Sequence, residues 1–329
     1  MQPLYRALSM AGALMIVWLG SRNVMGTGWV SWDIAAFTTF LACFTKLSVK
    51  VSKAAKLFNA VQKAQVSWGR VKPLLEGGSL PEETEPAAPA ALEVKDLTFA
   101  YPRGEMVLRD VSFTAAPGQI VGVTGPVACG KSTLGKAFLC EYPYQGSIRF
   151  GGKELRDMTA DERTSMVSYL GHQPELLGDS VRENVLLGSD GSPDPWLRAV
   201  CLEDEVAAMP SGADTQIGSG GIRLSGGQQA RLALARTLCH RRPVLILDDP
   251  FSAVDRTTEA QIMDHLETLA GDGIILLLSH RLDLFDRCDQ VIWMEEGRCR
   301  AGTHRELMET CNAYAQAFRE QKGGGHEAE

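Results

Sequence analysis

Two apolar segments near the start of the chain favour membrane helices. One covers residues 4–20 and is interrupted only by Arg6, and the other covers residues 34–44. Each is shorter than the roughly 20 residues of a full span. Basic residues follow the second segment, so the positive-inside rule places both outer ends in the cytoplasm, with residues 21–30 as an external loop. A signal peptide with Arg6 at its basic end is the alternative for the first segment.

The second apolar segment continues as a helical pattern well beyond the membrane. Ser31 offers a helix cap, and neither Pro nor Gly interrupts the chain from there until Gly69, which predicts one long helix that extends into the cytoplasm. We assign residues 1–75 to a partial transmembrane domain. Residues 76–91, EGGSLPEETEPAAPAA, are rich in Pro, Ala and Glu without apolar periodicity, so they predict an exposed linker.

From Leu92 onward the pattern predicts an α/β domain. Short strand patterns alternate with helical ones; the strands are LEVKDLTFAY (92–101), QIVGVT (119–124), VLILDD (244–249) and IILLLS (274–279). Apolar strands separated by helices predict a mainly parallel sheet. The expected fold is therefore an α/β domain over residues 92–320, with residues 321–329 as a disordered tail.

Charge is distributed unevenly along the 329 residues. The net charge is −7, yet residues 1–75 hold nine Lys and Arg against the single acid Asp33. The acidic remainder argues against a nucleic-acid partner, and the basic start suits the anionic cytoplasmic face of a membrane, with a solvated helix face as the alternative. Eight scattered cysteines without a CxxC pair predict reduced thiols in a cytosolic compartment.

The segment GPVACGKST, residues 125–133, fits the phosphate-binding pattern GxxxxGK[ST] between a strand and a helix. Its glycines let backbone N–H groups surround the phosphates of a nucleotide, while Lys131 reaches the outer phosphates and Ser132 coordinates Mg²⁺. The expected cofactors are ATP and Mg²⁺. The residues assigned to nucleotide binding here are Gly125, Cys129, Gly130, Lys131, Ser132 and Thr133.

Two adjacent acids end the apolar run VLIL. Asp248 stands where a phosphate-binding loop needs a carboxylate to hold the metal. Asp249 follows at once, and an acid in this second place orients or deprotonates the attacking water.

With LSGGQQARLALAR, residues 224–236, the chain resembles the ATP-binding cassette (ABC) family, more particularly the exporters that join membrane helices and cassette in one polypeptide. The resemblance covers about residues 92–319 strongly and residues 4–75 by layout. It implies that Tyr101 stacks on adenine and that Gln173 joins the Mg²⁺ site to the membrane domain. It also implies that His280 contacts the γ-phosphate.

The same resemblance implies a partner subunit. Ser225 and the N–H groups of Gly226 and Gly227, followed by Gln228, form an anion site at a helix start, and a second cassette has to bring its phosphate there. The loop from Ser252 to Asp255 looks like the one that crosses the dimer interface. Asp249, His280 and Gln173 are the expected catalytic residues, and Ser132, Gln173 and Asp248 the metal ligands.

Three departures from the family pattern shape the expected function. Asp249 stands where hydrolysing members carry the longer Glu, residues 218–221 (GSGG) replace a common Glu-Arg pair, and two apolar segments precede the cassette where half-transporters have about six. These features predict the C-terminal part of a half-transporter, multi-pass in the cell (inner) membrane with a cytoplasmic cassette, and weakly hydrolysing beside a partner that supplies Glu. A gene model truncated before Met1 would also explain the missing spans.

Two other functions remain open at this point. A soluble cassette ATPase would need no membrane, which the apolar start and the long basic helix oppose. A nucleotide-holding regulatory module is favoured by Asp249. The sequence identifies neither the transported solute nor the direction of transport.

Overall fold

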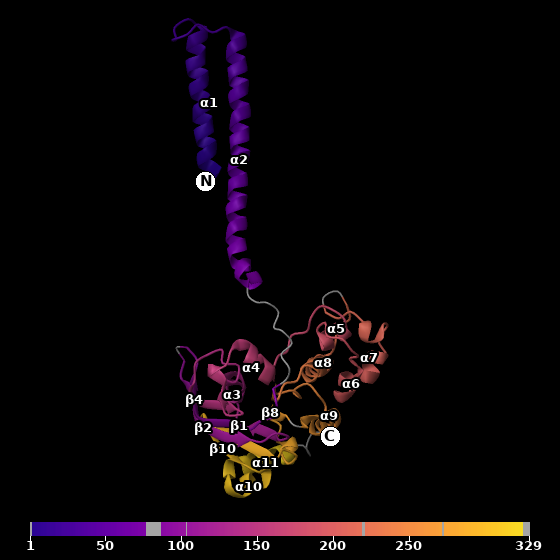
Figure 1. The fold of residues 1–329 in the computed structure, drawn as a ribbon. Helices are drawn as coiled ribbons and strands as arrows, with labels where there is room; N and C mark the ends of the chain where they lie inside the picture. The colour runs from indigo at the N-terminus through magenta and orange to yellow at the C-terminus, as the bar shows by residue number, and fades with distance from the viewer. Residues whose placement is uncertain (1, 77–86, 103, 219–220, 272, 325–329) are drawn as a thin grey trace. The chain divides into compact units, whose positions relative to one another are not determined.

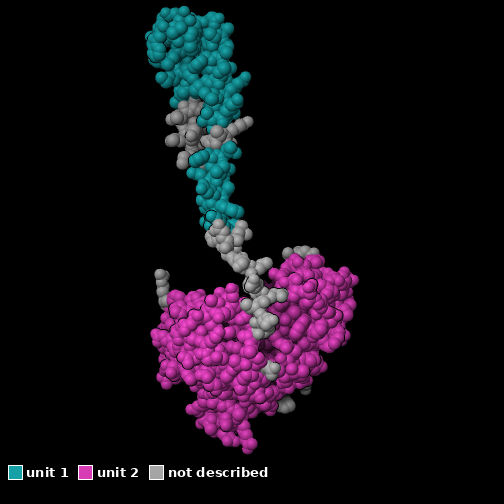
Figure 2. Space-filling model, viewed as in Figure 1, with its two compact units in different colours: residues 1–82 teal, residues 83–329 magenta. Residues whose placement is uncertain are grey.

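The computed structural model describes residues 2–76, 87–102, 104–218, 221–271 and 273–324. These form two compact units, residues 1–82 and 83–329, which Figure 2 shows in different colours. The predicted linker at 76–91 falls largely outside the described residues, because 77–86 are not among them. Residues 87–91 lead directly into the first strand of the second unit.

The first unit is a pair of helices, α1 (Gln2–Val24) and α2 (Ile34–Glu76), which lie side by side in Figure 1. Gly20 of α1 permits their close approach, because a β-carbon at that position would overlap the ring of Phe37 on α2. Apolar residues on both helices are exposed, among them Trp18 and Phe40. Within the described residues, one helical stretch, 34–51, is long and apolar enough to cross a membrane.

Helix α2 begins later than the sequence predicted. Its first turn is capped by Asp33, whose carboxylate accepts a hydrogen bond from the N–H of Ala36 at 2.6 Å, so the expected cap at Ser31 is wrong. A carboxylate at the helix start also complements the positive end of the helix dipole. The helix then continues through Gly69 to Glu76 as one element.

The second unit is built on a six-stranded sheet in the order β10-β9-β3-β8-β7-β6. The bounds are β3 (Ile120–Thr124), β6 (Val167–Leu170), β7 (Val244–Asp248), β8 (Ile274–Leu278), β9 (Gln290–Glu295) and β10 (Arg298–Gly302). Strands β9, β3, β8, β7 and β6 are parallel and β10 is antiparallel. Because other elements cover both faces of this sheet, β3, β7 and β8 are buried along their whole length, which confirms the α/β prediction.

A smaller antiparallel sheet has the order β2-β1-β4-β5. Its strands are β1 (Leu92–Ala100), β2 (Met106–Ala115), β4 (Gln145–Phe150) and β5 (Lys153–Glu154). The two sheets adjoin where the Arg109 N–H donates to the Gly297 carbonyl at 2.7 Å.

The helices of this unit complete two hydrophobic cores on opposite faces of the six-stranded sheet. Ile246 and Leu276 face the core of the small sheet and helix α3, whereas Leu245 and Leu277 face the core of helices α5 to α9. Helices α5 to α8 gather to one side in Figure 1. The bounds are α3 (Lys131–Ala137), α4 (Ala160–Met166), α5 (Val181–Leu186), α6 (Asp194–Ala199), α7 (Glu203–Ala207), α8 (Gly226–Cys239), α9 (Arg256–Ala270), α10 (His304–Thr310) and α11 (Asn312–Gly324), with short 3₁₀ helices η1 (Leu155–Asp157), η2 (Gly212–Asp214) and η3 (Leu282–Leu284).

The end of the domain lies further along the chain than predicted. Residues 321–324, which we had assigned to a disordered tail, continue helix α11 to Gly324. The helix is held because Tyr314 and Phe318, one turn apart, are buried in the larger core. The rest of the predicted tail, 325–329, lies outside the described residues.

Candidate nucleotide-binding site

The phosphate-binding loop connects the carboxyl end of β3 to the start of α3, as the sequence predicted. Gly130 has φ +106° and a β-carbon on Gly125 would overlap the Met294 carbonyl, so both positions require glycine. Ala128 also lies in the left-handed region, at φ +65°. The loop therefore turns back on itself sharply.

The charged side chain of the loop points into this turn. Lys131 Nζ donates hydrogen bonds to the carbonyls of Gly125 at 2.9 Å and Pro126 at 3.2 Å, and it lies 3.7 Å from Cys129 Sγ. Cys129 is buried and packs against the loop, so its part in the predicted binding set is to fill the turn. An ammonium group held within such a turn at the start of a helix is suited to a phosphate anion.

Two of the three predicted metal-binding residues, Ser132 and Asp248, meet at the end of β7. Ser132 Oγ donates to Asp248 Oδ1 at 3.0 Å, although 116 residues separate them in sequence. The other oxygen, Oδ2, accepts a hydrogen bond from the Tyr169 hydroxyl at 2.9 Å. A carboxylate and a hydroxyl are hard oxygen ligands of the kind that Mg²⁺ prefers, so Ser132 and Asp248 fit this ion.

Tyr169 is a site residue that the sequence did not single out. Burial and the neighbouring Asp248 carboxylate raise the pKa of its phenol, which therefore stays protonated and donates its hydrogen bond. Tyr169 lies on β6, the strand that pairs with β7. Its position as the next-to-last residue of β6, four residues before Gln173, is the signal that the sequence offers.

Asp249 has its carboxylate surrounded by polar groups from two loops. His280 Nδ1 lies 3.2 Å from Oδ1, and Ser279 Oγ donates to the same oxygen at 3.4 Å. His172 Nδ1 lies 3.5 Å from Oδ2. The backbone of Asp249 is left-handed, with φ +53°, a strained conformation of the sort found at functional sites.

Both loops leave the same edge of the sheet. His280 follows β8 and His172 follows β6, so the parallel strands bring their carboxyl ends together around Asp249. His280 had been predicted and His172 had not, although it immediately precedes Gln173 in the sequence. Gln173 itself is exposed on this loop. Its predicted roles in catalysis and metal binding stay predictions.

Tyr101, the predicted adenine platform, borders the same loop from the small sheet. Its hydroxyl lies 3.5 Å from Thr133 Oγ1 on α3. Its ring packs edge to face against Phe99 and Tyr142, with centroids 5.0 Å and 5.6 Å away. These neighbours fix the orientation of a ring that remains partly exposed.

The predicted signature residues form the start of α8. The buried side of this helix belongs to the core on the face of the sheet opposite α3. Ser225 caps the helix by a capping box: its Oγ accepts from the Gln228 N–H at 3.2 Å, and Gln228 Oε1 accepts from the Ser225 N–H at 2.8 Å. Gln228 also donates to Glu205 at 2.7 Å. Ser225 and Gly226 remain exposed, so a helix N-terminus with free N–H groups faces outward.

The loop from Ser252 to Asp255 lies against this helix start. A β-carbon on Gly227 would come within 2.7 Å of the Ala253 carbonyl, so glycine allows the loop to pass. Asp255 caps α9 by accepting from the N–H groups of Thr257 at 3.1 Å and Thr258 at 3.0 Å. Ser252 and Ala253 are exposed between these two anchors.

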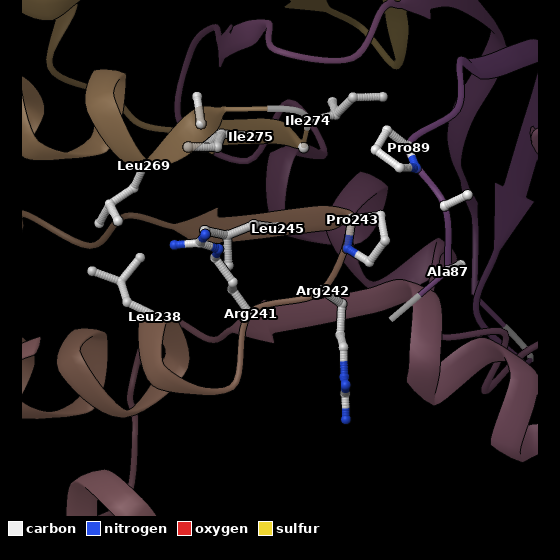
Figure 3. Close-up of a pocket in the computed structure, with 13 residues that line it drawn as sticks. Ala87, Pro89, Leu238, Arg241, Arg242, Pro243, Leu245, Leu269, Ile274 and Ile275 are labelled. Carbon is white, nitrogen blue, oxygen red and sulfur yellow. The ribbon is translucent and has the colours of Figure 1, made fainter. Parts of the chain in front are cut away.

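A cavity of about 610 Å³ opens at the opposite edge of the sheet (Figure 3). Its lining includes Pro243 and Leu245 at the start of β7 and Ile274 at the start of β8. In the close-up the Arg242 side chain points away from the other labelled side chains. Five-residue strands span about 13 Å, so this cavity is separate from the residues at the carboxyl ends.

Comparison with known proteins supports the assignment of an ATP-binding domain to the second unit. Residues 108–252 match the family model described as "ABC transporter". An "ATP-dependent lipid A-core flippase" of Burkholderia pseudomallei is 33% identical over 323 residues, covering 95% of this chain and 53% of that protein. A "Multidrug efflux ATP-binding/permease protein" of Mycobacterium tuberculosis is 32% identical over 326 residues, 95% of this chain and 27% of that protein.

The fold is also that of a solved exporter. A bacterial Atm1-family ABC exporter with ATP bound has a TM-score of 0.75 at 23% identity, over 97% of this chain and 58% of that one. The chain spans between about a quarter and about half of the length of the curated relatives it matches. The phosphate-binding loop, the paired acids and the signature segment all lie within residues 108–252, the part of the chain that matches the ABC transporter family model.

Proposed function

We propose that this chain is the ATP-binding and ATP-hydrolysing part of an ABC exporter that uses Mg²⁺-ATP and works with a second half-transporter in a membrane. The observation that carries the proposal is that the phosphate-binding loop and the signature segment lie in separate parts of one chain. The phosphate-binding loop, Asp248, Asp249 and His280 meet at one edge of the sheet, whereas the exposed anion-binding start of α8 belongs to the other core.

Each residue has a defined task in this scheme. Lys131 and the loop N–H groups would bind the phosphates of ATP, and Ser132 and Asp248 would hold Mg²⁺, which when bound neutralises charge on the phosphate oxygens. His280 would contact the γ-phosphate and Asp249 would orient the attacking water. Gln173 would join this site to the membrane domain, and Tyr101 would stack on adenine.

The partner would complete two composite sites. Ser225, Gly226, Gly227 and Gln228 would meet the phosphates held by the partner, with the loop from Ser252 to Asp255 across the interface. The chain's own site would be the slower one, because its Asp249 carboxylate is one bond shorter than that of Glu and misplacement by about 1 Å costs on the order of a hundredfold in rate. The partner would supply the Glu.

The membrane assignment rests on the first unit. Residues 34–51 could cross a membrane, and both helices expose apolar side chains. We propose that lipid surrounds these helices, that further spans are supplied by another part of the transporter, and that the ATP-binding domain faces the cytoplasm. Relatives named as a lipid A-core flippase and as a multidrug efflux protein suggest a lipophilic substrate.

The second candidate is a module that holds nucleotide without hydrolysing it. The contacts of Asp249 with His172 and His280 favour it, because they occupy both carboxylate oxygens. Phosphate release by the full chain in detergent, compared with its Asp249→Glu variant, separates the two. Our proposal predicts slow release that rises on the order of tenfold or more with Glu. If neither protein releases phosphate while both bind ATP, the regulatory function is the correct one.

A further inference from the structure

The C-terminal helix reaches the nucleotide site through one amide side chain. Gln321 Nε2 donates a hydrogen bond to the His280 carbonyl at 2.7 Å, and the Leu282 N–H donates to Gln321 Oε1 at 2.9 Å. The two bonds bridge the backbone on either side of Arg281. A carboxamide carries the donor and the acceptor that this bridge requires, which a carboxylate or an ammonium does not.

The position of Gln321 is fixed by the packing of α11. Phe318 is buried at 7% exposure, and Gln321 follows it by three residues, so both side chains share one face of the helix. Tyr314, one turn earlier, is fully buried. These aromatic residues belong to the same core as Leu282, so the helix and the loop it bridges are packed on a common base.

The bridge completes the support of the loop that carries His280. On the strand side, the Ser279 N–H donates to the Val123 carbonyl at 3.0 Å and Ser279 Oγ accepts from the Arg281 N–H at 3.0 Å. On the helix side, Gln321 holds the next two peptide units. The His280 imidazole, which lies 3.2 Å from Asp249, therefore extends from a backbone fixed at both ends.

From this arrangement we infer that Gln321 is a positioning residue for His280 and sets the affinity of the site for ATP over ADP. The inference rests on the proposed nucleotide site, in which His280 contacts the γ-phosphate. Since ADP lacks this phosphate, displacement of the loop weakens binding of ATP and leaves binding of ADP unchanged. Preorganisation of this kind lowers the cost of ordering the loop when ATP binds.

The test is the variant Gln321→Glu in the full chain in detergent. Glu has the same shape and still accepts from the Leu282 N–H, but it places an oxygen against the His280 carbonyl. We expect the ratio of Mg²⁺-ATP to Mg²⁺-ADP affinity, measured by equilibrium fluorescence, to fall about three- to tenfold, as for one lost hydrogen bond with an unpaired acceptor.

A matched control lies on the same helix. Gln316→Glu makes the same chemical change at an exposed position whose amide contacts Glu320, and it should leave the ratio within about twofold of wild type, because surface changes are small. In a His280→Ala background, Gln321→Glu should have no further effect, since it acts through His280.

A direct structural readout accompanies the affinities. Gln321→Met removes both bonds, so the Leu282 amide should exchange its hydrogen faster, while the Phe285 amide, which donates to the Leu282 carbonyl at 3.0 Å, should be less affected. An unchanged ratio in Gln321→Glu, or an equal loss in the His280→Ala background, would overturn the inference. Loss of the proposed site itself shows differently, as ATP affinity that is insensitive to Lys131→Ala.

Discussion

The phosphate-binding loop and the start of α8 are the two surfaces to which we assign anion binding, and they differ in how many polar groups of this chain surround them. Around the loop, residues from β3, β6, β7 and β8 converge, with Ser132 and Tyr169 on Asp248 and both histidines on Asp249. At the start of α8, Ser225 is bonded within its own helix and exposed toward solvent. In our proposal, the loop therefore binds nucleotide with groups from this chain, whereas the start of α8 binds the nucleotide held by the partner.

We expect the largest effect from a substitution in the phosphate-binding loop. Lys131→Ala should lower ATP affinity on the order of ten- to a hundredfold, because it deletes a charged donor that points into the loop. Equilibrium fluorescence with a labelled nucleotide measures this. Lys136→Ala, further along α3, is a suitable control with the same loss of charge. Equal affinities in the two variants would mean that ATP does not bind at this loop.

A smaller effect is expected at the other surface. Ser225→Arg should leave ATP on the chain's own loop but reduce Mg²⁺-ATP-dependent dimerisation by about tenfold, because a bulky cation fills the anion-binding helix start. Light scattering follows the dimer. The control is Thr303→Arg, which removes an equivalent capping box with the same 2.8 and 3.2 Å bonds at α10. Similar losses in both would indicate that general destabilisation, rather than the surface, is responsible.

The smallest effect concerns Asp249 in the assembled transporter. Asp249→Asn should change steady-state phosphate release by less than about twofold when a partner with Glu is present, because the partner's site carries most of the turnover. The isolated chain should lose its slow release under the same conditions. If the variant abolishes release by the assembled heterodimer, Asp249 is a working base and the proposed asymmetry is wrong.

The local sequence pattern was sufficient to predict the parts of the site that a single segment of the chain forms. The loop at 125–133, the acids that end β7 and the cap of α8 each follow from neighbouring residues, and the structure places all three as expected. Three strands of the parallel sheet, β3, β7 and β8, were equally readable because they are continuous apolar runs, whereas β6 and β9 were not predicted.

Residues that reach the site by tertiary packing were missed. Tyr169 lies 79 residues from Asp248 in sequence, and Gln321 lies 41 residues from His280. Neither has a pattern that distinguishes it from an ordinary strand or surface residue. Gln321 was placed in a tail because the polar sequence after it outweighed the aromatic pair that buries α11. Asp33 was passed over as a cap because Ser31 satisfied the same rule two residues earlier.

The claim that the two surfaces belong to different nucleotides has one direct test. Because a second copy of this chain carries both surfaces, it can replace the Glu-bearing partner in this test. Chains carrying Lys131→Ala and chains carrying Ser225→Arg are mixed in detergent with Mg²⁺-ATP, and dimers are counted by light scattering. Each variant alone lacks one half of every composite site, whereas a mixed dimer joins the intact loop of one chain to the intact helix start of the other. We predict that the mixture forms clearly more dimer than either variant alone. If the mixture forms no more dimer than its separate components, the two surfaces do not meet across an interface and the account is contradicted.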